Sequence, residues 1–108
     1  MASENIVVLV TTPASDIAGQ ISQLLLEKKK AACVNTISNI NSSFWWQGKI
    51  ETQKESLLII KTRTDLLDSI IKLVKKVHPD KVPEIIALPV VGGNPDYLKW
   101  MNKTLKRD

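Results

Sequence analysis

The sequence has a single cysteine, Cys33, and a single histidine, His78. One thiol cannot form a disulfide framework, so a reducing compartment, the cytoplasm, is expected. The first residues lack the basic and apolar stretches of a secretory signal. No apolar run approaches the roughly 20 residues of a transmembrane helix. The sequence therefore predicts a cytoplasmic protein without a membrane partner.

Recognisable catalytic and nucleic-acid-binding motifs are also missing. There is no Ser-His-Asp order, no Gly-rich phosphate loop and no His-rich metal motif, so we do not expect an enzyme. The formal net charge is only +4. The lysines gather near expected helix ends, as in Lys28, Lys29 and Lys30, whereas a nucleic-acid binder more often clusters them on one face. We expect these lysines to be solvated and no nucleic acid to be a partner.

Hydrophobic periodicity predicts strands alternating with helices in 108 residues, the length of one domain (residues 1–108). Ile6 to Val10 is a continuous β-branched run, typical of a strand buried on both faces. Asn94 followed by Pro95 is a strong helix start. The expected elements, in order, are a strand at 6–10, a helix from Ser15 or Asp16 to Lys30, strands at 31–46 and 49–60 around a turn at 47–48, a helix at 64–77, a strand at 84–91 and a last helix from 94.

This order defines the fold class as α+β. It is the ferredoxin-like βαββαβ order, which predicts a four-stranded antiparallel sheet with two helices on one face. An extended hairpin between the second and third strands and an extra C-terminal helix are additions to that plan. The polar stretch at 39–43 predicts a kink or bulge in the second strand.

The hairpin is too long for one small domain. Its return arm is mostly polar from Lys49 to Ser56 and wholly apolar only from Leu57 to Ile60. Phe44, Trp45 and Trp46 lie next to the turn, and aromatic residues are enriched at interface cores. We expect the hairpin to join copies of the chain, with a ligand-stacking platform as the alternative.

Several stretches resemble the CutA divalent-cation-tolerance family. They are Ala31-Ala32-Cys33-Val34-Asn35, Trp46-Gln47-Gly48-Lys49-Ile50-Glu51, Lys61-Thr62, His78-Pro79 with Pro83-Glu84-Ile85, and Asp96-Tyr97-Leu98 with Trp100. The resemblance implies a homotrimer whose hairpins reach neighbouring subunits, with an architecture similar to that of the PII signalling proteins. It also implies a role in tolerance of copper and other divalent metals.

The family's proposed copper ligands correspond here to Val10, Val77 and His78, of which only His78 can bind copper or another divalent cation. A helix-capping role is the alternative for this side chain. Cys33 reads as a buried strand residue, for which packing is expected.

Lys61 and Glu84 also match family positions. With Trp46 they are candidates to line an inter-subunit cleft for a small anionic or metal-bound ligand, and a structural ion pair is the alternative. A PII-like signalling or scaffold protein without a metal site is the alternative function.

Three other classes share this fold. Acylphosphatases need an arginine in the loop after the first strand, which here reads Thr11-Thr12-Pro13-Ala14-Ser15. RNA-binding domains carry aromatics on their central strands, and metallochaperones carry a Cys-x-x-Cys motif. The sequence has none of these features.

Overall fold

A four-stranded antiparallel sheet is the centre of the computed structural model, which describes residues 4–105. The strands lie in the order β2-β3-β1-β4, which confirms the α+β, ferredoxin-like prediction. The elements are β1 (Asn5–Pro13), α1 (Ile17–Glu27), β2 (Cys33–Trp46), β3 (Lys49–Arg63), the short 3-10 helix η1 (Thr64–Leu66), α2 (Leu67–Val77), β4 (Ile85–Pro89) and α3 (Pro95–Thr104).

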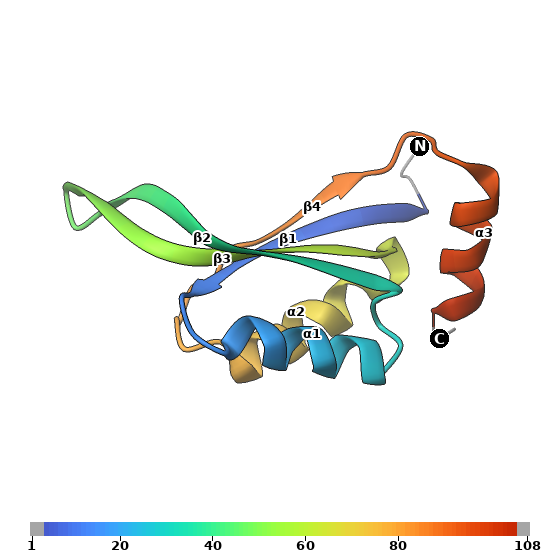
Figure 1. Cartoon of the computed structure of the whole chain (residues 1–108), viewed down its shortest axis with the longest axis horizontal. Helices are drawn as coiled ribbons and strands as arrows, with labels where there is room; N and C mark the ends of the chain where they lie inside the picture. Colours follow the sequence, from blue (N-terminus) through green and yellow to red (C-terminus); the bar gives the residue numbers. More distant parts are fainter. Residues whose placement is uncertain (1–3, 106–108) are drawn as a thin grey trace.

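The core lies between one face of the sheet and the helices α1 and α2, which cover the same side (Figure 1). Side chains alternate across a strand, so every second residue of β1 and β3 points toward the helices. Residues at helical spacing on α1 and α2 complete this layer. The fully buried members are Val8, Val10, Ile21, Leu25, Leu58, Ile60, Ile70 and Val74.

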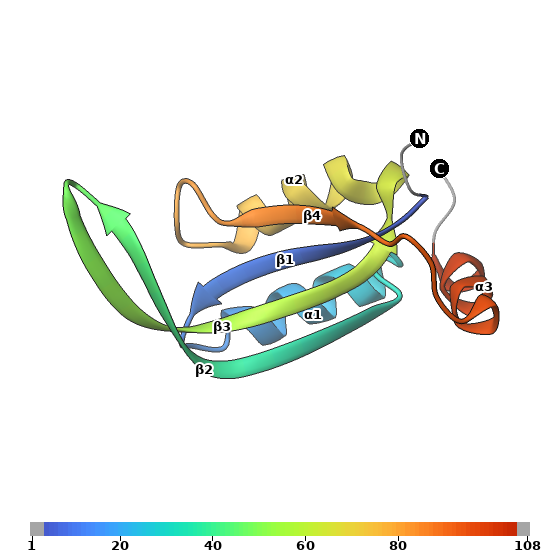
Figure 2. The same ribbon diagram turned by 90° about the horizontal axis from the view of Figure 1, so that it is seen from above.

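The opposite face of the sheet, which we call the open face, carries no helix from the described part of the chain (Figure 2). Val7 and Leu9 of β1 point to this side and are only half-buried. The prediction that residues 6–10 are buried on both faces is therefore wrong for the single chain. The aliphatic residues of the open face are Val7, Leu9, Ile37, Leu57, Ile59, Ile86 and Leu88.

The β2–β3 hairpin extends past the rest of the sheet (Figure 1). β1 ends at Pro13, opposite Glu55, whereas β2 and β3 remain paired as far as Trp46 and Lys49. The radius of gyration is 14.4 Å, compared with about 13 Å for a compact chain of this length. The predicted irregularity is confirmed as a register shift between Ile37 and Ile40.

All four strands differ in extent from the predictions, and β1 and β3 are longer than expected, covering Asn5–Pro13 and Lys49–Arg63. β2 begins at Cys33 rather than Ala31, and Ala31 and Ala32 are buried where the chain passes from α1 into the sheet. β4 covers only Ile85–Pro89. It pairs with β1 alone and stops where that partner begins, and Val91 beyond it is 97% exposed.

The helix α3 docks at the end of the sheet where β1 begins (Figures 1 and 2). As predicted, Asn94 caps it by accepting a hydrogen bond from the Asp96 backbone N–H. Met101 is buried against the core, and Asn5 donates a hydrogen bond to Asn102 at 3.0 Å. None of the helices in residues 4–105 is long and apolar enough to cross a membrane.

Candidate functional site

The imidazole of His78 is buried and has both nitrogens in hydrogen bonds. Its side chain is 1% exposed. Nε2 lies 2.8 Å from the Thr11 carbonyl oxygen, and Nδ1 accepts from the Asp80 backbone N–H at 3.0 Å. A carbonyl only accepts and an amide N–H only donates, so the ring is the neutral tautomer that carries its proton on Nε2. The ring therefore ties the end of α2 to β1.

This arrangement does not fit a metal ligand. Coordination through Nδ1 would displace the Asp80 N–H, and coordination through Nε2 would remove its proton and its bond to Thr11. The other two positions that match the family's proposed copper ligands are Val10 and Val77, which have no donor atom. Within residues 4–105, no three His, Cys, Asp or Glu side chains come together as a metal-binding group.

A polar cluster lies on the open face where the sheet approaches α3. Cys33 pairs with Lys61 across β2 and β3, and Asn35 is on the same face of β2. The Lys61 ammonium donates a hydrogen bond to Asn35 Oδ1, and the Cys33 thiol lies 3.9 Å from the same oxygen. Cys33 is half-buried rather than buried as predicted, because this face has no helix over it.

Tyr97 of α3 belongs to this cluster. Partial burial and the neighbouring Cys33 sulfur raise the pKa of the Tyr97 hydroxyl above its ordinary value. Its ring lies 5.4 Å from that of Trp100 at 38°. Together these residues, from β2, β3 and α3, form a partly exposed cluster that contains an ammonium, an amide, a thiol, a phenol and an indole.

Lys61 has no carboxylate partner within ion-pair distance among residues 4–105, where its ammonium is hydrogen-bonded to the Asn35 side chain. The alternative prediction of an ion pair between Lys61 and Glu84 is therefore wrong within one chain. Lys61 is opposite Val7 of β1, and the residue after Glu84 is opposite Val10. Glu84 itself is one residue farther along, so its offset from Lys61 is four residues, or about 13 Å along the sheet at about 3.3 Å per residue.

Trp46 lies still farther from Lys61. It pairs with Lys49, at the other end of β3, and twelve residues at about 3.3 Å each make roughly 40 Å of strand. The three residues predicted to line one cleft are thus not brought together in a single chain. Trp46, Lys61 and Glu84 can meet only if they come from different copies.

Asn35 and Tyr97 are members of the cluster that the sequence did not identify as site residues. Both occur in the stretches that resemble the CutA family, but their proximity to Lys61 depends on the strand register. Counting from the turn at Gln47-Gly48 predicts that register only if the shift between Ile37 and Ile40 is known. The cluster is therefore a result of the fold.

Apolar side chains are exposed at the hairpin tip. Trp45, Trp46 and Ile50 are 73%, 60% and 66% exposed. On the open face, Ile86 and Leu88 of β4 are 51% and 47% exposed. Exposed apolar side chains in such number, at the hairpin tip and on the open face, are typical of a protein–protein contact surface.

The sequence matches the CutA1 family, described as divalent ion tolerance protein, over residues 6–104. It is 41% identical over 97 residues to the divalent-cation tolerance protein CutA of Thermus thermophilus, covering 90% of this chain and 94% of the relative. It is 45% identical over 102 residues, 94% of this chain, to a rice protein named CutA 1, chloroplastic. The chain spans 58% of the length of that rice protein and 53% of the length of a mouse CutA.

The fold comparison agrees with the sequence comparison. The crystal structure of rice CutA1 superimposes with a TM-score of 0.94 at 43% identity, covering 99% of this chain and 98% of the other. The Thermus thermophilus protein gives a TM-score of 0.92 at 39% identity and covers 94% of this chain.

Proposed function

Because the chain belongs to the CutA1 divalent ion tolerance family, we propose that it is a non-catalytic homotrimer that contributes to divalent-ion tolerance. Its ligand site then lies between subunits and takes a small anion, free or carrying copper or another divalent ion. We further propose that residues 1–108 act as one domain and work in the cytoplasm, which the lone thiol favours.

The observation that carries this proposal is the open face of the sheet. Its aliphatic residues come from all four strands, opposite the core, and the most exposed of them are on β4. Leaving such a face in water costs free energy in proportion to its apolar area. A second and third copy packed against this face remove that cost.

The hairpin supports the same assembly. Beyond Glu55 it is a two-stranded ribbon, and an isolated two-stranded hairpin is marginally stable in water. A neighbouring subunit supplies the packing that the arm lacks. In that arrangement the exposed Trp46 at its tip becomes part of the interface.

The cluster around Lys61 supports a ligand site for an anion. An ammonium without a carboxylate partner attracts negative charge, and Tyr97 and Cys33 add polar hydrogens beside it. A neighbour's Trp46 or Glu84 would complete the cleft, as expected from the sequence. A cleft of this kind favours PII-like binding of a small ligand over direct metal ligation, because both nitrogens of His78 are already in hydrogen bonds.

The test compares Lys61→Gln with Lys103→Gln, which removes the same charge from α3. Small anionic metabolites, each with and without Cu(II), are added while the melting temperature is followed, because ligands that bind the native state raise it. We expect a rise for the wild type and for Lys103→Gln, and none for Lys61→Gln.

A local readout accompanies the melting curves. Tyr97 is the only tyrosine, so the phenolate absorbance of the chain reports its titration alone. An anion bound beside Lys61 disfavours the phenolate and raises the Tyr97 pKa further. If no ligand moves either measurement, or if the two variants respond alike, the cleft is not the binding site.

A further inference from the structure

A hollow of about 640 Å³ lies on the helical side of the molecule, where the end of α1 meets the flank of α2. We call it the lysine groove. Its lining combines two segments about 40 residues apart in the sequence: Glu27, Lys28, Lys29 and Lys30, and Ser69, Lys72, Leu73 and Lys76. The lysine groove does not share a residue with the cluster around Lys61.

The charge of this groove is concentrated. Among the eight described residues that line it, five are lysines and one is a glutamate, which makes a formal charge of +4. That equals the net charge of the whole chain. The glutamate, Glu27, already accepts a hydrogen bond from Gln23 at 2.6 Å. Glu27 is thus the one carboxylate among the described residues that line the groove.

Helix dipoles account for only part of this arrangement. Lysines at the end of α1 compensate a partial charge of about half an electron, which one lysine would satisfy. Lys72 and Lys76 are four residues apart on α2, so they lie side by side on one helical face, and like charges at this spacing repel. Lys72 and Lys76 therefore repel each other when no anion is bound beside them.

We propose that the lysine groove is a binding site for a small, multiply phosphorylated anion. Lysine ammonium groups are compact charges with three rotatable donors, suited to phosphate oxygens. The volume is within the range of small-molecule sites. No aromatic side chain lines the hollow, so the ligand is recognised through its charged groups and not by stacking of a base.

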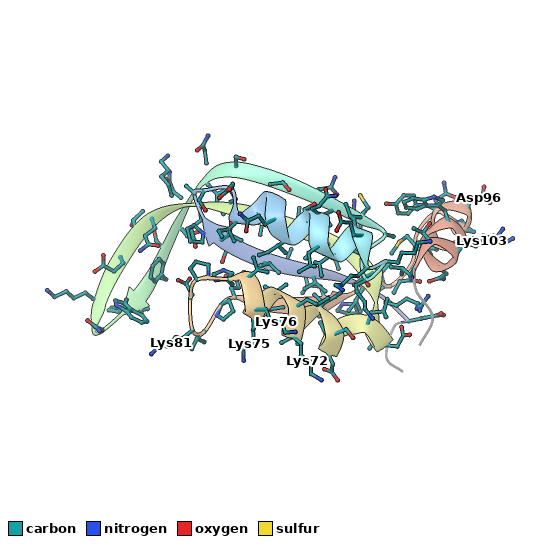
Figure 3. The ribbon with its side chains drawn as sticks, turned by 90° about the horizontal axis from the view of Figure 1, so that it is seen from below. Lys72, Lys75, Lys76, Lys81, Asp96 and Lys103 are labelled. Carbon is teal, nitrogen blue, oxygen red and sulfur yellow. The ribbon has the colours of Figure 1, made fainter. Side chains whose placement is uncertain are left out.

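The groove stays accessible in the assembly proposed above. It lies on the helical layer, whereas the open face and the hairpin tip are on the other side and at the far end of the sheet (Figures 1 and 2). In Figure 3, Lys72, Lys75 and Lys76 project outward from α2, away from the core. This site is independent of the proposed site at Lys61.

The experiment titrates the full chain with inorganic tripolyphosphate by calorimetry, at ionic strengths of about 0.01 M and 0.15 M, where Debye lengths are about 30 and 8 Å. Lys72→Gln/Lys76→Gln is compared with Lys99→Gln/Lys103→Gln. Both variants remove two exposed lysines spaced by four residues on one helix. Lys103 lies on α3 (Figure 3), and neither Lys99 nor Lys103 is among the residues that line the groove.

We expect tripolyphosphate to bind the wild type, more weakly at the higher salt. The groove variant should bind about tenfold more weakly, a loss equivalent to two exposed charge pairs, and the α3 variant less than about twofold. Without the anion, the groove variant should melt no lower than the wild type, because its repulsion is relieved.

Three results would overturn the proposal. One is the absence of binding by the wild type at either salt. Another is an equal loss of tripolyphosphate affinity in the two variants, which would indicate that the anion is attracted by the net charge of the protein alone. The third is tighter binding of duplex DNA or phosphatidylserine vesicles through Lys72 and Lys76, which would replace the small anion by a macromolecular partner.

Discussion

At the residue scale, His78 shows how surroundings decide the role of a side chain. The only imidazole of the chain is the obvious metal ligand by composition. Its nitrogens instead join Thr11 of β1 to Asp80 of the following loop. The fold has the opposite effect on Lys61. It leaves the ammonium without a carboxylate partner among the described residues, and Lys61 therefore becomes a candidate ligand-binding group.

The role of His78 predicts the behaviour of His78→Ala. The substitution leaves a buried carbonyl and a backbone N–H without partners and removes a packed ring. It should lower the free energy of unfolding by about 2–4 kcal/mol, measured by urea denaturation at equal chain concentration. Cu(II) titration of the tag-free protein should be unchanged. Loss of copper binding together with unchanged stability would instead make His78 a ligand.

At the element scale, the β2–β3 hairpin combines a well-defined turn with an incomplete arm. Gln47 and Gly48 both have positive φ, at 50° and 77°, as a two-residue hairpin turn requires. On either side of the turn, β2 and β3 pair without a register shift as far as Ile40 and Glu55, and the Ser43 and Thr52 hydroxyl oxygens lie 3.0 Å apart. The arm is therefore pre-formed for a partner, while its exposed tryptophans are not packed.

Trp46→Ala should weaken the assembly without unfolding the chain. A tryptophan at an interface core typically contributes about 2 kcal/mol or more, so each subunit interface should weaken by about 30-fold or more and dissociation should appear at higher chain concentration. Light scattering over a dilution series measures it. Val82→Ala is the control, because Val82 is 91% exposed in the loop before β4. A Trp46→Ala protein that stays fully assembled at every dilution would contradict the proposed role of the hairpin.

At the scale of the whole molecule, the two sides of the sheet differ in chemistry. The open face is aliphatic, and the helical side carries the lysine groove. We propose that the first is covered by copies of the chain and that the second faces solvent and binds an anion. Anion binding in the lysine groove is then independent of assembly, whereas binding beside Lys61 requires the neighbouring subunit.

Ile86→Lys tests the open face. Ile86 is 51% exposed in the single chain, so a lysine there should change monomer stability by less than about 0.5 kcal/mol. Burying that charge between subunits should cost several kcal/mol and produce monomers in size-exclusion light scattering. Val82→Lys adds the same charge outside the face and should leave the assembly intact. Trimers that persist with Ile86→Lys would exclude the open face as the interface.

The order of elements, the turn at Gln47-Gly48 and the cap at Asn94 could all be predicted, because each depends on residues within a few positions of one another. The family resemblance rested on such local stretches. The candidate cleft was predicted only as a set of residues, and Trp46, Lys61 and Glu84 prove to be separated within one chain.

Local periodicity and turn chemistry thus determined which segments are strands or helices and which side of each is apolar. Tertiary structure alone decided that Asn35 and Tyr97 join the cluster at Lys61, that His78 bonds to β1, and that Lys28 and Lys72 line the same groove. Those contacts join residues far apart in the sequence. They depend on strand register, on a bulge and on how α1 and α2 pack side by side, which no short stretch of sequence encodes.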